Sequence, residues 1–264
     1  MTAPADPPLL AADEPAAATL VNEAGGAIFF LACDHAGRAI PRRLGTLGLP
    51  PSEPARHTAW DIGIAGVDRE LSRRLDAALI PQTCSRLVID CNRDPAVASS
   101  VPEIAETTAI PGNRGLSAAA RAARLAAIFR PYHDALAGAL DRRAAQGRAT
   151  VLTALHSFTP VFKGSARPWH VGVLFNRDTR LARPLLRLLG AEGDLVVGKK
   201  RPYSVSDLTD YTVPVHGERR GVPSVEIEIR QDLIAAPEGQ AAWAARLARL
   251  LPAAWAATMR DAMR

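Results

Sequence analysis

Short apolar runs alternate along this chain with longer stretches in which apolar residues recur every three or four positions. A short apolar run is typical of a buried strand, and the longer recurrence is typical of an amphipathic helix. The alternation therefore predicts an α/β fold, a three-layer α/β/α sandwich whose mostly parallel sheet carries helices on both faces. The expected strands are residues 27–32, 87–90, 150–155, 170–175, 195–197 and 225–229.

The helical stretches supply the outer layers of this sandwich. We expect helices at residues 58–76, 117–146, 179–189 and 237–263. Thr58 and Ser117 are the expected N-caps of the first two, because a hydroxyl there accepts a hydrogen bond from the first helical turn. Pro131 is expected to kink the second helix. Residues 92–115 are expected to form a long loop, and residues 199–222 an ordered lid.

No shift in composition divides the 264 residues, so we expect a single domain over residues 21–264. Residues 1–20 are rich in Ala and Pro and are expected to form a disordered leader. The longest apolar run covers residues 27–33. A bilayer requires roughly 20 apolar residues in succession, so we expect no membrane association.

The charge and the cysteines restrict the partners and the compartment. The formal net charge is +5, but the basic residues are nearly all arginines scattered along the chain. Nucleic-acid binding requires basic residues gathered on one face, so no nucleic-acid partner is expected. Cys33, Cys84 and Cys91 are odd in number and form no C-x-x-C pair, which indicates reduced thiols in the cytoplasm. The oligomeric state stays open.

Polar residues gather where the expected strands end. His35 follows the first strand, Asn92 and Arg93 follow the second, His156 follows the third, and Glu228 lies in the last. Ligands of open α/β sheets bind outside the carboxyl ends of the strands. These residues are therefore expected to face one site at the rim of the sheet.

The two histidines predict a metal ion at this rim. Neutral imidazoles are usual ligands of catalytic zinc, with a third protein ligand and an open position for water. Asp61, near the start of the expected first helix, is the best third ligand. The alternative is that His35 and His156 only cap loops through backbone hydrogen bonds.

Arg93, with its neighbour Asn92, is expected to bind a substrate carboxylate, because a guanidinium holds a carboxylate with two parallel hydrogen bonds. Asp94 could instead neutralise Arg93. Arg86 either forms a surface ion pair or polarises a scissile carbonyl. Tyr203 belongs to the expected lid, where it could contact substrate or merely pack.

The last strand places Glu226, Glu228 and Arg230 on one face, because strand side chains alternate. A carboxylate on an interior face could take a proton from a metal-activated water and pass it to a leaving nitrogen. Glu228 is the preferred base, since it lies closer to the carboxyl end of the strand. The alternative is an edge strand whose acidic face is solvated.

Nucleotide-binding motifs such as G-x-G-x-x-G and the serine-hydrolase motif G-x-S-x-G are absent from the sequence. Other segments do form a recognisable set, namely CDHA (33–36), HTAWDIG (57–63), SRLVIDCNR (85–93), IPGN (110–113), HSFTP (156–160) and VEIEIRQDL (225–233). Together these segments resemble the N-formylglutamate amidohydrolase family. The similarity extends from about residue 21 to residue 250.

The resemblance implies a phosphorylase/hydrolase-like domain, similar to zinc carboxypeptidases and aspartoacylases. Those enzymes present, in chain order, a metal histidine, an arginine, an Asn-Arg pair, a second metal histidine, a lid tyrosine and a catalytic glutamate. This chain offers, in the same order, His35, Arg86, Asn92 with Arg93, His156, Tyr203 or Tyr211, and Glu228.

One position departs from that pattern. Zinc carboxypeptidases place a glutamate three residues after the first metal histidine, and here that residue is Arg38, which cannot bind zinc. The metal carboxylate must come from elsewhere, with Asp61 preferred and Asp34 in reserve.

The expected activity is metal-dependent hydrolysis of N-formyl-L-glutamate, or a related N-acyl amino acid, to the acid and the free amino acid. The cofactor is expected to be Zn²⁺ or another divalent ion. The alternative is a non-catalytic module that binds an acidic ligand on the same fold.

Overall fold

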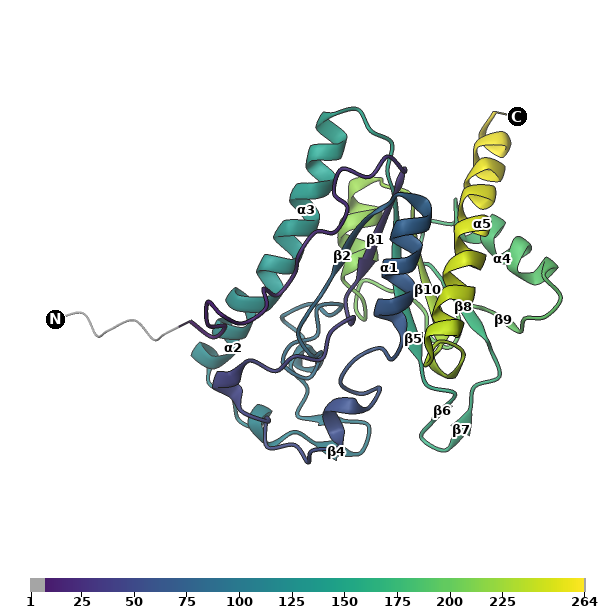
Figure 1. Cartoon of the computed structure of the whole chain (residues 1–264). Helices are drawn as coiled ribbons and strands as arrows, with labels where there is room; N and C mark the ends of the chain where they lie inside the picture. Colours follow the sequence, from purple (N-terminus) through teal and green to yellow (C-terminus); the bar gives the residue numbers. More distant parts are fainter. Residues whose placement is uncertain (1–7, 264) are drawn as a thin grey trace.

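A six-stranded sheet forms the centre of the molecule (Figure 1). The computed structural model describes residues 8–263. Every neighbouring pair in the sheet is parallel except β10 with β8, which is antiparallel. The mostly parallel, mixed sheet is thereby confirmed. In spatial order its strands are β2 (Ala78–Pro81), β1 (Phe29–Cys33), β5 (Val151–Phe158), β10 (Ser224–Arg230), β8 (Val171–Leu174) and β9 (Val197–Lys199).

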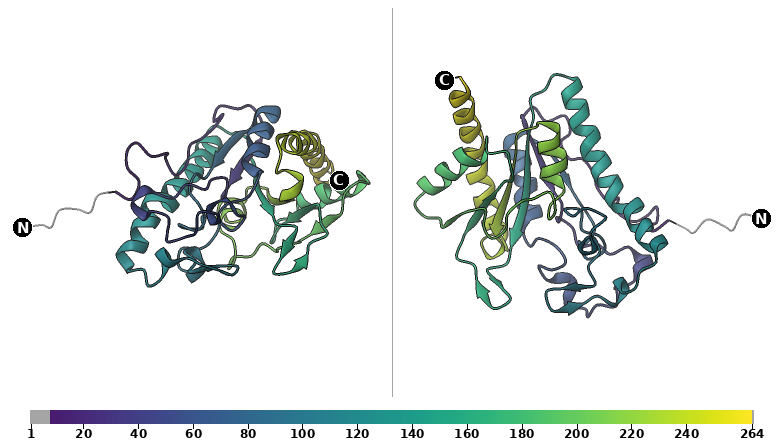
Figure 2. Two further views of the ribbon diagram at one scale, coloured as in Figure 1. Left: turned by 60° about the horizontal axis from the view of Figure 1, so that its bottom comes forward. Right: turned by 180° about the vertical axis from the view of Figure 1, so that it is seen from behind.

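Helices cover both faces of this sheet (Figure 2). On one face, α1 (Ile64–Leu75), α4 (Ala182–Ala191) and α5 (Pro237–Ala262) pack on alternate strand residues such as Leu31 and Ile227. On the other face, α3 (Arg130–Ala145), which follows the short α2 (Ala118–Arg124), packs in a core that includes Phe30 and Leu152. Strands β1, β2 and β5 contribute side chains to both cores, which is why they are rich in apolar residues.

Small elements complete the fold. Two hairpins pair β3 (Ile104–Ala105) with β4 (Thr108–Ala109) and β6 (Val161–Phe162) with β7 (Ser165–Ala166). π-Helical segments cover Leu125–Phe129 and Thr212–Gly217. The 3₁₀ turns are Arg42–Leu44, Glu53–Ala55, Ala98–Ser100, Pro111–Asn113, Glu218–Arg220 and Gln231–Leu233.

The expected cap at Ser117 is confirmed, and a π-helical turn follows it. The Ser117 hydroxyl accepts a hydrogen bond from the Ala120 N–H at 3.1 Å. The helix then runs through the π-helical turn and continues as α3, in which Pro131 is the second residue. Pro131 has no N–H to donate, and a widened turn accommodates such a missing hydrogen bond.

The expected strand at residues 87–90 is wrong, and the strand of the sheet in this region is β2 instead. Residues 87–89 are buried, but they lie in a turn whose polar groups bond to side chains. Asn113 Nδ2 donates to the Leu87 carbonyl at 2.8 Å, and Arg124 Nη1 donates to the Val88 carbonyl at 3.0 Å. Because side chains satisfy these groups, the segment needs no neighbouring strand.

The expected helix start at Thr58 is also wrong, because α1 begins at Ile64. Gly63 precedes it with a φ of 82°, and a Cβ built there would lie 2.1 Å from the Ile234 carbonyl oxygen. Only glycine fits this close, left-handed position. Residues 58–63 therefore form a bent approach, in which Asp61 N–H donates to the His35 carbonyl at 3.0 Å.

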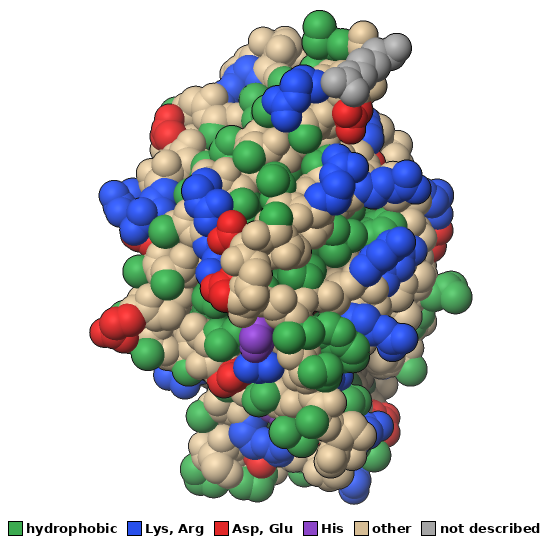
Figure 3. All heavy atoms as spheres, turned by 90° about the vertical axis from the view of Figure 1, so that its right-hand side faces the viewer, with side chains coloured by type: hydrophobic (Ala, Val, Ile, Leu, Met, Phe, Trp, Pro, Cys, Tyr) green, Lys and Arg blue, Asp and Glu red, His purple; other side chains and the backbone are tan. Residues whose placement is uncertain are grey.

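The structure also bears on the expected leader, on membrane-spanning helices and on the distribution of surface charge. Residues 1–7 of the expected leader lie outside the described residues, whereas Ala17 is buried and its carbonyl accepts the Thr83 N–H at 2.9 Å. In residues 8–263, none of the helices is both long and apolar enough to cross a membrane. Lys and Arg side chains are spread among acidic and apolar ones on the face drawn in Figure 3.

Candidate active site

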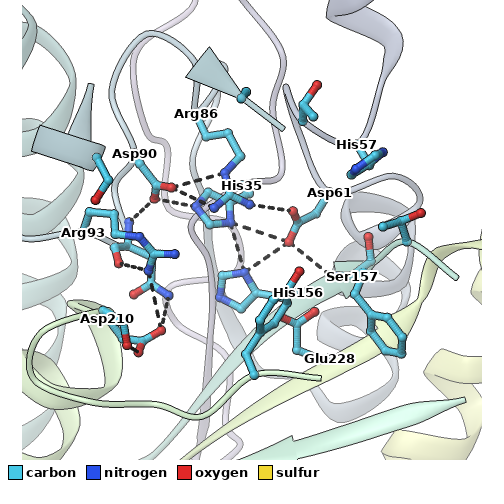
Figure 4. A pocket seen from close by; sticks show the side chains of 18 of the residues that line it. His35, His57, Asp61, Arg86, Asp90, Arg93, His156, Ser157, Asp210 and Glu228 are labelled. Atoms are coloured by element: carbon cyan, nitrogen blue, oxygen red, sulfur yellow. Dashed lines mark hydrogen bonds and ion pairs between the residues drawn. The ribbon is translucent and has the colours of Figure 1, made fainter. Parts of the chain in front are cut away.

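A cavity of about 500 Å³ opens at the carboxyl ends of β1, β5 and β10 (Figure 4). The sheet topology brings to it residues that are more than a hundred positions apart in the chain. All eight site residues predicted from the sequence line this cavity. They are His35, Asp61, Arg86, Asn92, Arg93, His156, Tyr203 and Glu228.

Two imidazoles and one carboxylate converge inside the cavity. His35 Nδ1 lies 3.1 Å from His156 Nδ1, and Asp61 Oδ2 lies 3.1 Å from His156 Nδ1 and 3.6 Å from His35 Nδ1. All three side chains are buried. His156 lies within β5, two residues before the strand ends, rather than in the loop predicted for it.

The spacing of these three atoms fits a divalent ion. Zinc bound at about 2.0–2.1 Å with tetrahedral angles holds its ligand atoms about 3.3 Å apart. The observed separations lie on both sides of that value, and two nitrogens with one carboxylate oxygen form a usual zinc donor set. His35, Asp61 and His156 are therefore the residues that could hold a metal ion.

The charges around the histidines support the same conclusion. Burial and Arg86 disfavour protonation of His35, but Asp90 and Asp61 outweigh them and raise its pKa. Burial likewise opposes protonation of His156, but Glu226, Asp34 and Asp61 raise its pKa well above the usual value. The site thus attracts positive charge, and a metal ion competes with protons for the same atoms.

Hydrogen bonds from surrounding groups fix the orientation of the three candidate ligands. His35 Nε2 lies 2.7 Å from Asp90 Oδ1, and Asp61 Oδ2 accepts the Ser157 N–H at 3.0 Å. A carboxylate on the far nitrogen of a histidine is the common support of a metal-binding imidazole. Asp34, the reserve ligand, lies on the far side of His156, with Oδ2 3.3 Å from Nε2, and is outside the converging group.

Arg86 lies between two acids of this cluster. Its Nη2 is 2.8 Å from Asp90 Oδ2, and its Nη1 is 3.5 Å from Asp61 Oδ1. The pair with Asp90 is thus internal to the site, and the surface ion pair considered above is wrong. Arg86 brings a fixed positive charge beside the atoms that could hold a metal ion.

Asn92 and Arg93 face an acid from the lid segment. Asn92 Nδ2 lies 3.4 Å and Arg93 Nη1 3.9 Å from Asp210 Oδ1. Asn92 Oδ1 also accepts the N–H groups of Tyr211 and Thr212, at 2.9 and 3.1 Å. Asn92 therefore holds the lid segment in place, and the pair already presents donors to a carboxylate.

Glu226 and Glu228 are buried on the cavity side of β10, a central strand, so the solvated edge considered above is wrong. Burial raises the pKa of Glu228 to about 7 and that of Glu226 well above its usual value. Oε2 of each carboxyl has no hydrogen-bond partner within the described residues. A carboxyl with a pKa near neutrality suits a group that both accepts and donates a proton.

Three site residues escaped the sequence analysis. Asp90 bonds to both His35 and Arg86, Asp210 faces Asn92 and Arg93, and His57 lines the cavity beside Glu106. Asp90 ends an apolar run, and Asp210 lies between two tyrosines of the predicted lid, so both positions carried a signal. Their partners, however, depend on contacts between distant segments.

Comparison of the sequence with protein families gives a match over most of the chain. The family model of N-formylglutamate amidohydrolase matches residues 27–235. None of the curated proteins gives a significant match.

Two solved structures are similar over most of the chain. Gene product Atu2144 from Agrobacterium tumefaciens has 40% sequence identity and a TM-score of 0.91, over 94% of this chain and 98% of its own. N-formylglutamate amidohydrolase from Ralstonia eutropha JMP134 has 20% identity and a TM-score of 0.72, over 94% of this chain and 100% of its own, and supports the fold. Since the family model covers most of its length, this chain belongs to the N-formylglutamate amidohydrolase family.

Proposed function

We propose that this protein is a metal-dependent amidohydrolase that cleaves N-formyl-L-glutamate or a closely related N-acyl amino acid. The observation that carries the proposal is the convergence of His35, Asp61 and His156 in a cavity that also contains Glu228. Zinc is the proposed ion, because two imidazoles and a carboxylate suit it. Such an ion would supply Lewis acidity for activating water and polarising the carbonyl.

Glu228 is the proposed proton carrier. In its ionised form it accepts a proton from the attacking water, and in its protonated form it donates that proton to the amide nitrogen as the C–N bond breaks. The products are the free acid, formate for a formyl substrate, and the amino acid. A pKa of about 7 lets the carboxyl occupy both states near neutral pH.

Arg86 and Arg93 would each stabilise a different negative charge of the substrate. Arg86, fixed by Asp90, is positioned to stabilise negative charge that develops on the carbonyl oxygen. Arg93 and Asn92 would bind the substrate α-carboxylate, since they already face the carboxylate oxygen of Asp210. Tyr203 would contact the substrate from the lid side of the cavity.

The test is formate release from N-formyl-L-glutamate by protein reconstituted with zinc. We expect Glu228→Gln to lower kcat roughly 10²- to 10⁴-fold and to keep the bound metal, because it removes the proton carrier alone. Glu238→Gln, an exposed site in the first turn of α5, is the matched control. Failure to bind zinc and to release formate would contradict the proposal.

The second candidate, a non-catalytic binding module, makes a different prediction in the same assay. It would bind the substrate without turnover, and Glu228→Gln would then have no activity to remove. The raised pKa of Glu228 favours the enzyme, because a mere binding site gains nothing from a carboxyl that ionises near neutrality. A single domain over residues 21–264, a cytoplasmic location and the lack of a nucleic-acid partner stay predictions from the sequence.

A further inference from the structure

Arg167 is a buried arginine directly after β7, and it contacts Phe162 and Tyr203, which both line the cavity. Only 9% of its surface is exposed. Its Nη1 donates to Tyr203 Oη at 2.9 Å, and its guanidinium carbon lies 4.4 Å from the Phe162 ring centroid and 4.8 Å from that of Tyr203. Its backbone N–H donates to the Pro160 carbonyl at 2.8 Å. The guanidinium is therefore held in one place by two aromatic rings and a phenol.

The charge of Arg167 has no acidic partner in the described part of the chain, residues 8–263. The two arginines that line the cavity differ in this respect: Arg86 binds Asp90, and Arg93 faces Asp210. A buried guanidinium without a carboxylate is costly unless something else supplies the negative charge.

Two other buried arginines also lack an ion pair within the described residues, so burial alone does not indicate a binding site. Arg124 and Arg143 each donate to backbone carbonyl oxygens, which makes them structural ties. The side chain of Arg167 instead donates to a phenol that lines the cavity. This contact separates it from the structural arginines.

Tyr203 connects Arg167 to the cavity. The tyrosine lines the cavity and keeps 44% of its surface exposed. Its oxygen accepts the hydrogen bond from Arg167, which leaves its own hydrogen available to a partner. A neighbouring cation also makes a phenol a stronger donor. The pair therefore offers a charge-assisted donor to the cavity, and the partner that such a donor prefers is an anion.

We propose that Tyr203 and Arg167 recognise a second carboxylate of the substrate, on its side chain. The inference rests on the proposed function, in which Arg93 receives the α-carboxylate. Tyr203 donates to the side-chain carboxylate, and Arg167 acts as the positioning residue that holds and polarises the phenol.

The test compares N-formyl-L-glutamate with N-formyl-L-glutamine, which differs only by a neutral amide at the side chain. Zinc-loaded protein is assayed for kcat and KM, and binding of both compounds is measured by calorimetry. We expect the wild type to favour the glutamate compound roughly 10- to 100-fold in kcat/KM, mainly through KM. Arg167→Gln should remove this preference, and Arg167→Lys should restore part of it.

Arg201→Gln is the matched control, because Arg201 also stacks on an aromatic ring, Trp169, but is exposed. It should keep the wild-type preference. Tyr203→Phe is the second variant, in case Arg167→Gln fails to fold. It removes only the phenol oxygen and should lose the same preference.

Equal kcat/KM for the two compounds in the wild type would overturn the proposal, as would equal losses on both compounds in Arg167→Gln. The binding measurement separates this inference from the proposed function. Suppose that neither compound is hydrolysed, but the wild type binds the glutamate compound more tightly and Arg167→Gln does not. The carboxylate recognition by Tyr203 and Arg167 is then supported, and the proposed hydrolase activity is contradicted. If the protein binds neither compound, the proposed carboxylate recognition is contradicted as well.

Discussion

Two pairs of buried histidines lie on the same side of this sheet, at nearly the same separation. His35 Nδ1 and His156 Nδ1 are 3.1 Å apart, and His133 Nδ1 and His216 Nε2 are 3.0 Å apart. The rings of the first pair meet edge to face at 64°, whereas those of the second are stacked within 9° of parallel. Distance and burial thus fail to distinguish the pairs, and their surroundings must do so.

Carboxylates surround the first pair, whereas among the described residues no carboxylate forms a hydrogen bond or ion pair with the second. Asp61 and Asp90 raise the pKa of His35, while burial lowers the pKa of His133 and, together with His133 and Arg220, lowers that of His216 to about 3. A neutral pair of imidazoles in an apolar setting is a structural contact. The comparison teaches that a converging carboxylate is what makes one histidine pair able to hold a metal ion.

The hydrogen bonds of the second pair also determine its tautomers. His133 Nε2 lies 2.8 Å from the Cys91 carbonyl, which can only accept, so this nitrogen carries the hydrogen. His133 Nδ1 then accepts, and His216 Nε2 donates to it. His216 Nδ1 is left without a hydrogen-bond partner in the part of the chain that the structure describes. The lone pair of His133 Nδ1 is thus used by the hydrogen bond from His216. The remaining lone pair, on His216 Nδ1, does not converge with it on one point.

The largest expected effect comes from replacing one histidine of each pair. His156→Gln should reduce zinc affinity by more than the roughly 10- to 100-fold that outer partners of a ligand typically cost, because it removes a ligand itself. Formate release should fall with the zinc content. His216→Gln should retain wild-type zinc content, measured by elemental analysis after dialysis. If His156→Gln retains its zinc, the conclusion that only the first histidine pair binds the metal is contradicted.

A smaller effect is expected from the carboxylate that supports the first pair. Asp90→Asn keeps the size of the side chain but weakens its bond to His35 Nε2, and the zinc dissociation constant should rise roughly 10- to 100-fold. Competition with a metal chelator measures this change. Asp141→Asn, at an exposed acid paired with Arg220, is the control and should leave zinc affinity unchanged. Equal affinities for both variants would show that Asp90 does not support the ligand.

The sequence predicted the layers of the fold well, because the period of the apolar residues depends on backbone geometry alone. It failed where a buried segment obtains its hydrogen bonds from side chains. Residues 87–89 are as apolar as a strand, but Asn113 and Arg124 bond to their carbonyls. Apolar composition reports burial and leaves the hydrogen-bond partner of the backbone undetermined.

The eight predicted site residues came together for a topological reason: parallel strands bring their carboxyl ends to one edge. What the sequence left open was how these residues pair. Asp61 was expected in a helix, and it lies in the bent approach to α1 that Gly63 makes possible. The partnership of Asp90 with His35 and that of Arg167 with Tyr203 join segments 55 and 36 residues apart, and no local pattern encodes them.

The neutral state of the second pair, His133 and His216, should make the stability of the protein depend on pH. His216 has a pKa of about 3 when folded and about 6.5 when unfolded, so only the unfolded chain binds this proton between those values. The free energy of unfolding therefore falls as the pH drops below about 6.5, by about 2 kcal/mol between pH 7 and pH 5 for this group.

Denaturant unfolding at both pH values measures this loss. His216→Gln should show a loss smaller by about that amount, because its amide does not titrate. The difference between the two proteins cancels the contributions of the other titrating groups. Identical losses in wild type and variant would mean that His216 is not held in its neutral form, and the two pairs would then be electrostatically alike.

The smallest expected effect distinguishes Tyr203 from Tyr211, the two tyrosines of the predicted lid. The Tyr211 ring packs 4.6 Å from that of His133 and 4.9 Å from that of Phe129, so Tyr211→Leu should lower the free energy of unfolding by about 1 kcal/mol and leave kcat/KM unchanged. Tyr203→Phe should do the reverse, because its phenol faces the cavity while its ring remains. If Tyr211→Leu lost activity to the same degree, the structural pair would be coupled to catalysis through the segment that Asn92 holds, and the division between the two regions would be wrong.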